Sequence, residues 1–161
     1  MRGSAERRKE AMSSTVHINE SVRIDRPPPE VWDAIADYAF DLRWRNGLRD
    51  MTPDPPGGPN PGTKVHEVVR SMGRDFVADT VVTAVDPGSS YRFAGEGTIG
   101  GVAGGRSVDP EADGAVFTYD IEVTPRGGTR LLRPLLGPVV RSGLKRDLRK
   151  LKGLLEARKA A

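Results

Sequence analysis

The chain has 161 residues, of which 37% are hydrophobic and 29% charged, with a formal net charge of +3. This length suits one domain with a single core. No apolar run approaches the ~20 residues of a membrane-spanning helix and no secretory signal is present, so we expect a soluble, cytoplasmic protein. The lack of cysteine excludes disulfides and thiolate chemistry, and two histidines are too few for a histidine-rich metal site.

The first residues carry no apolar periodicity. We expect residues 1–13 to be a disordered or cloning-derived leader, and residues 14–161 to form one ligand-binding domain.

Apolar and polar residues then alternate from Val16 to Ile24, which predicts a half-buried strand. The prolines that follow, with Glu30, are typical of the first turn of a helix, and this helix has two to three turns. A second short helix carrying Trp44 is predicted over residues 41–48. The prolines between residues 53 and 61 predict a loop.

Beyond that loop the chain reads as antiparallel strands over residues 63–71, 75–85, 91–96 and 116–124. The connections between most of them are short, which favours hairpins over parallel crossovers. Residues 135–157 repeat apolar side chains every three or four positions and predict one long amphipathic helix. Pro138 is expected to kink this helix or mark its true start.

The glycine-rich stretch from Gly95 to Gly105 matches the spacing G-x-G-x-x-G of dinucleotide-binding proteins. That motif binds a pyrophosphate only where a helix follows the glycines. Further glycines follow Gly100 instead, so we expect neither a nucleotide nor any other cofactor. Two interpretations remain: a flexible hairpin at the sheet edge, or a rim that contacts a ligand.

The order of these elements resembles the helix-grip fold of the START-like (SRPBCC) superfamily, and within it the polyketide cyclase/dehydrase and lipid-transport family. Four segments carry the resemblance: residues 21–38 with the following Trp44, residues 62–64, residues 85–93 and residues 148–156. The resemblance implies an α+β fold in which a curved antiparallel sheet of six or seven strands surrounds the long C-terminal helix. It also implies a cavity for a hydrophobic small molecule, of about 300–1,000 Å³ as such pockets usually are.

The side chains expected to line this cavity are large and face the space between sheet and helix. They are Trp44, Tyr91, Phe93, Phe117, Tyr119, Ile121, Leu136, Val140 and Leu144. For each of them ordinary core packing is the alternative.

Two functions follow from the resemblance. A polyketide cyclase or dehydrase would need an ionisable group inside the cavity, and Asp79 and His66 are the candidates for general acid–base catalysis. If both side chains project into solvent, the hypothesis that they catalyse the reaction fails. The alternative is a non-catalytic carrier or sensor of a lipid, quinone or polyketide, with a cavity that is almost wholly apolar. No metal is expected in either case.

The basic residues are concentrated at the end of the chain, where residues 133–161 hold nine basic and two acidic side chains. A solvated outer face of the last helix is one interpretation. Docking of an acidic carrier protein or of an anionic membrane surface are the others. No nucleic-acid-binding motif accompanies the charge, so nucleic acid is not expected as a partner.

Overall fold

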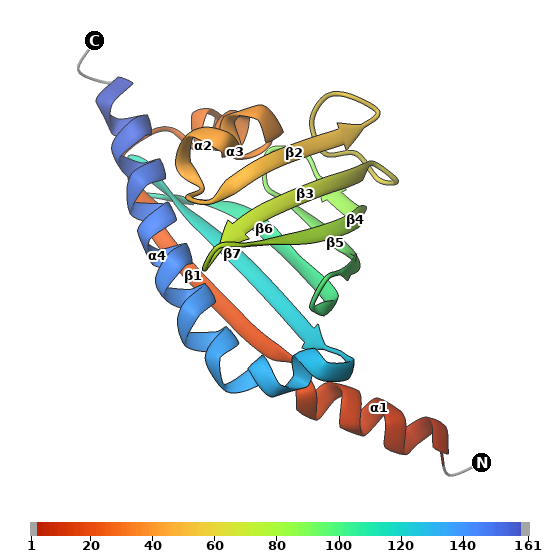
Figure 1. Cartoon of the computed structure of the whole chain (residues 1–161). Helices are drawn as coiled ribbons and strands as arrows, with labels where there is room; N and C mark the ends of the chain where they lie inside the picture. Colours follow the sequence, from red (N-terminus) through yellow and green to blue (C-terminus); the bar gives the residue numbers. More distant parts are fainter. Residues whose placement is uncertain (1–2, 159–161) are drawn as a thin grey trace.

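The computed structural model describes residues 3–158. Seven antiparallel strands form one curved, open sheet in the order β1-β7-β6-β5-β4-β3-β2 (Figure 1). The strands are β1 (Val16–Ile24), β2 (Leu48–Asp54), β3 (Lys64–Ser71), β4 (Arg74–Asp86), β5 (Ser90–Gly97), β6 (Gly100–Glu111) and β7 (Gly114–Pro125). Strands β2 to β7 follow one another as hairpin neighbours, while β1 closes the far side by pairing with β7.

Helices cover one face of this sheet. The long helix α4 (Arg133–Ala157) runs beside β1, and α2 (Pro28–Ile35) and α3 (Tyr38–Trp44) lie nearer to β2 (Figure 1). The short 3-10 helix η1 (Gly127–Leu132) connects β7 to α4. This is the predicted arrangement of a curved sheet around a long C-terminal helix.

Helix α4 is held by its apolar stripe. Leu144, Leu148, Leu151 and Leu155 recur at helical spacing and are buried in one core cluster with the inward-facing residues of the strands. Burial of each such side chain is worth about 1.5–3 kcal/mol, so this stripe orients the helix. The helix begins at Arg133 and continues through Pro138, so this proline does not mark its start.

Several elements differ from the expectation. Residues 3–14, where no element was expected, form helix α1 (Gly3–Ser14); arginine, lysine, glutamate and alanine, which favour helix, dominate this segment. The second short helix covers residues 38–44 instead of 41–48. The chain then enters edge strand β2, which accommodates Pro53 because an edge strand has backbone groups without ladder partners.

The glycine-rich stretch is part of hairpin β5–β6, and β6 lies inside the sheet between β5 and β7. The expected flexible hairpin at the sheet edge is therefore wrong. A Cβ added at Gly104 would lie 2.1 Å from the backbone oxygen of Asp120 in β7, and one at Gly95 would lie 2.0 Å from that of Asp79 in β4. Glycine is needed here because the neighbouring backbone approaches too closely for a side chain.

Within residues 3–158, no helix is both long enough and apolar enough to cross a membrane.

Candidate functional site

A buried ion pair lies between the sheet and the short helices. Arg106 of β6 points inward, because it shares a face with Gly104 and Val108, and its side chain is fully buried. It binds the equally buried Asp41 of α3 through both terminal nitrogens, with Nη1 3.0 Å from Oδ1. The same Nη1 donates to the backbone oxygen of Ile35, at 2.9 Å. This two-pronged pairing fixes the guanidinium plane.

A second ion pair extends the first. Arg45, one helical turn after Asp41, binds Glu67 of β3 and also approaches Asp41 at 3.5 Å. Burial would raise the pKa of Glu67, but the Arg45 guanidinium holds it below its ordinary value. Burial would likewise lower the pKa of Arg106, but Asp41 holds it well above the ordinary value. Two arginines and two carboxylates thus meet in this cluster, so its formal charges balance.

Aromatic rings surround Arg106. Its guanidinium carbon lies 4.5 Å from the ring centroid of Tyr119, 5.3 Å from that of Trp44 and 6.0 Å from that of Tyr91. Such contacts stabilise a cation that has left water. Burial raises the pKa of Tyr38 to about 12 and that of Tyr91 well above its ordinary value, so both phenols keep their protons at neutral pH.

Some polar atoms of this site have no hydrogen-bond partner. They are the hydroxyl of Tyr38, which lies near that of Tyr91 but outside hydrogen-bonding geometry, the indole nitrogen of Trp44 and Nε of Arg106. All three can donate a hydrogen bond, and a buried donor without an acceptor costs about 1–3 kcal/mol. Buried donors of this kind can bind an acceptor supplied by a ligand.

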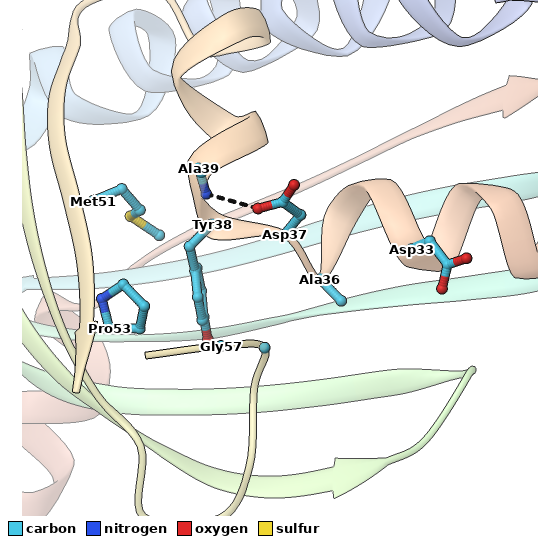
Figure 2. Close-up of a pocket in the computed structure, with 9 residues that line it drawn as sticks. Asp33, Ala36, Asp37, Tyr38, Ala39, Met51, Pro53 and Gly57 are labelled. Atoms are coloured by element: carbon cyan, nitrogen blue, oxygen red, sulfur yellow. Dashed lines mark hydrogen bonds between the residues drawn. The ribbon is translucent and has the colours of Figure 1, made fainter. Parts of the chain in front are cut away.

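Two adjoining pockets reach the site. The outer pocket has a volume of about 350 Å³ and is lined by Asp33, Ala36, Asp37, Tyr38, Ala39, Met51, Pro53, Gly57 and Gly58. Figure 2 shows the ring of Tyr38 between Met51 and Pro53 on one side and Ala36 on the other.

The inner pocket has about 10 Å³ of free volume, enough for one water at most. It is lined by Tyr38, Met51, Val65, Glu67, Thr80, Tyr91, Phe93, Arg106 and Tyr119. Tyr38 and Met51 line both pockets. These two side chains therefore separate the outer space from the polar interior.

The predicted catalytic pair lies elsewhere. Strand alternation turns Val65 and Glu67 inward and His66 outward, and Asp79 pairs with His66 across the outer face. The Nδ1–Oδ1 distance is 2.6 Å, and the side chains are 45% and 69% exposed. The hydrogen bond to Asp79 raises the pKa of His66. Because both project into solvent, this pair does not supply the interior group that the cyclase hypothesis requires.

The predicted ligand-binding residues divide into two groups. Tyr91, Phe93 and Tyr119 line the inner pocket. The others line neither pocket and pack in or against the core: Trp44, Phe117, Ile121, Leu136, Val140 and Leu144. Thus the space between the sheet and α4 is filled by side chains, and the open space lies between the short helices and β2. Ligand contact remains a prediction for all of them.

Sequence analysis named none of the residues of this cluster as site residues: Tyr38, Asp41, Arg45, Glu67 and Arg106. A signal was present, because Asp41 follows Tyr38 by three residues and precedes Trp44 by three. Residues at this spacing share one face of a helix. A carboxylate between two aromatic residues on a buried helix face predicts an interior ion pair.

A sequence profile of the family described as polyketide cyclase / dehydrase and lipid transport matches residues 15–158. No curated protein matches the chain.

Solved structures with low sequence identity share the fold. The di-domain ARO/CYC StfQ from the steffimycin biosynthetic pathway is 16% identical, with a TM-score of 0.76 over 98% of this chain and 56% of its own length. TTHA0849 from Thermus thermophilus is 17% identical, with a TM-score of 0.75 over 89% of this chain and 99% of its own. Ara h 8.0201 is 13% identical, with a TM-score of 0.66 over 89% of this chain and 99% of its own. With the profile match, these likenesses confirm the helix-grip fold, and the chain belongs to the polyketide cyclase/dehydrase and lipid-transport family of the SRPBCC superfamily.

Proposed function

We propose that this protein binds a neutral, hydrophobic small molecule whose buried end carries oxygen acceptors, such as a polyketide or a quinone. The observation that carries the proposal is the pair of donors without a hydrogen-bond partner, the Tyr38 hydroxyl and Arg106 Nε, beside two adjoining pockets. Tyr38 and Arg106 both line the inner pocket, so a ligand oxygen that reached it would offer these donors an acceptor. The body of the ligand would occupy the outer pocket, whose 350 Å³ lies within the usual range for small-molecule sites.

The charge balance favours a neutral ligand. Arg45 and Arg106 are matched by Asp41 and Glu67 within the same cluster. A ligand carboxylate placed there would compete with two carboxylates that already hold the guanidinium groups, and its desolvation would not be repaid. We therefore expect neutral carbonyl compounds to bind more tightly than fatty acids.

The finer proposal is a cyclase or dehydrase. When a poly-keto chain loses a proton from a methylene group, the negative charge develops on a carbonyl oxygen, and the resulting carbanion attacks a second carbonyl. Arg106 and the protonated phenol of Tyr38 would stabilise that oxygen as the charge grows. In a dehydration, the same phenol would donate a hydrogen bond to the departing hydroxyl group.

A non-catalytic carrier is the second candidate, and one observation favours it. The two carboxylates of the cluster, Asp41 and Glu67, are both bound by arginines. The Arg45 guanidinium lowers the pKa of Glu67, which makes Glu67 a weaker base. Catalysis would then depend on water as the proton acceptor, whereas binding needs only the donors and the pocket.

The test compares three probes of similar size by titration calorimetry: 1,4-naphthoquinone, naphthalene and 2-naphthoate. The quinone should bind at least tenfold more tightly than naphthalene, and the anion more weakly than the quinone. Tyr38→Phe should remove much of the advantage of the quinone. Thr118→Val, which deletes a hydroxyl from the outer face, is the matched control.

Equal affinity for quinone and naphthalene would overturn the proposal. Cyclisation of a linear poly-keto thioester by the wild-type protein would decide for the enzyme. An intact lipid, quinone or polyketide copurifying at near one-to-one, with no turnover, would decide for the carrier.

A further inference from the structure

An exposed apolar surface lies where β7 passes into α4. It consists of Leu131 (85% exposed), Leu135 (59%), Val139 (42%) and Leu132 (40%), and is called here the leucine corner. Leu131, Leu135 and Val139 follow at intervals of four residues, so they form one stripe along η1 and the start of α4. Figure 1 places this segment at the end of the molecule where α1 also lies, away from α2 and α3.

The leucine corner is separate from the stripe that holds the helix to the sheet. Leu136 and Leu144 are buried and Val140 packs against the core, while Leu135 and Val139 face outward from the same turns. The start of α4 is thus apolar on two faces, only one of which the described fold covers. A single exposed leucine needs no explanation, but a contiguous group of four is typical of an interaction surface.

The segment that carries the leucine corner is basic. Residues 123–146 contain six basic residues and no aspartate or glutamate. Arg126 and Arg141 bind Glu96 and Glu20 from neighbouring strands. Within residues 3–158, Arg130, Lys145 and Arg146 make no ion pair with a carboxylate.

We propose that the leucine corner docks this protein on an anionic lipid surface. Lipid headgroups carry the charge that complements these basic residues, and the acyl region directly beneath accepts leucine side chains. Arginine suits such a boundary because its apolar stem extends along the buried surface while its guanidinium stays among the phosphates. Neither pocket is lined by a residue of this corner, so the proposal is independent of the ligand site.

The experiment measures co-sedimentation with vesicles of phosphatidylcholine alone and of phosphatidylcholine with one third phosphatidylglycerol. Binding to the anionic vesicles should be at least tenfold stronger and should fall as salt rises. The triple variant Leu131→Ser, Leu135→Ser, Val139→Ser should lose at least tenfold of this binding. The control Met72→Ser removes a 78% exposed side chain from the β3–β4 turn and should bind like wild type.

Insertion is tested separately with a fluorophore. The chain has no cysteine, so Leu135→Cys and Met72→Cys each provide a single labelling site. An environment-sensitive label at position 135 should brighten and shift to the blue on anionic vesicles, and one at position 72 should not.

Three results would overturn the proposal. The first is no binding to anionic vesicles. The second is anionic binding that the triple serine variant retains, which would mean that charge alone acts. The third is a wild-type dimer in solution that the triple variant dissolves, which would assign the corner to a second copy of this chain. None of these results bears on the quinone titration.

Discussion

Replacing Asp41 by asparagine is expected to cost about 3–5 kcal/mol of the free energy of unfolding, because it leaves a buried guanidinium without its counter-charge. Arg106 and Asp41 are both fully buried and joined by two hydrogen bonds. The remaining partners of Arg106, the Ile35 carbonyl and the Tyr119 hydroxyl, are neutral. A loss of this size is a large share of the roughly 5–15 kcal/mol that stabilises a domain.

The double variant Asp41→Leu, Arg106→Met removes both charges. It should recover most of the loss, since replacing a buried pair by apolar residues of similar volume is often neutral or stabilising. Urea unfolding of the wild type, the single variants Asp41→Leu and Arg106→Met and the double variant, followed by circular dichroism, gives the free energies for a double-mutant cycle. The exposed pair Arg126–Glu96 is the control, and Glu96→Gln there should cost about 1 kcal/mol or less. A loss below about 1 kcal/mol for Asp41→Asn, or additive effects in the cycle, would refute the reasoning.

Three further predictions concern single positions. Tyr38→Phe should raise the free energy of unfolding of the ligand-free protein by about 1 kcal/mol in urea, because it removes a buried hydroxyl without a partner; a loss of stability would show that the hydroxyl is bonded. In Asp79→Asn, a nuclear magnetic resonance titration should find the pKa of His66 lower than in wild type, and an unchanged pKa would contradict the assigned hydrogen bond. In wild type, the small stabilisation from this exposed pair is present below the ordinary histidine pKa of about 6.5 and is lost as the pH rises through the raised pKa. Gly104→Ala should destabilise the protein by about 1–3 kcal/mol, because its Cβ meets backbone, whereas Gly128→Ala, with nothing within 4 Å, should not; equal effects in thermal unfolding would disprove the close approach.

The fold could be predicted where local pattern and burial agree. Along β7, Phe117 and Tyr119 alternate with Thr118 and Asp120, and the structure buries the aromatic pair. Alternation identifies the faces of such a strand because successive side chains point to opposite sides. The long helix was predictable for the same reason.

Strand β6 could not be found from its sequence. Its first half is mostly glycine and alanine, which leave no alternation to read, and glycine is unfavourable in an isolated strand. Its position is set by neighbours on both sides, β5 and β7, that have strong strand patterns of their own. Because β6 was missed, the inward direction of Arg106 was missed too.

The interior ion pairs depend on residues far apart in the chain. Asp41 and Arg106 are separated by 65 positions, and Arg45 and Glu67 by 22. Sequence spacing tells which residues share a helix face or a strand face, but not which two faces meet. The pattern within one helix or strand therefore indicates which side chains point inward, but not which ion-pair partner each of them meets.

The close backbone contacts of Gly95 and Gly104 bear on how ligand preference could change in relatives of this protein. Both glycines lie in strands whose other residues line the inner pocket: Phe93 in β5 and Arg106 in β6. A larger residue at either glycine would push a neighbouring strand outward and carry the lining with it. The size of the inner pocket can thus be altered by residues that do not line it, because they change the bend of the sheet.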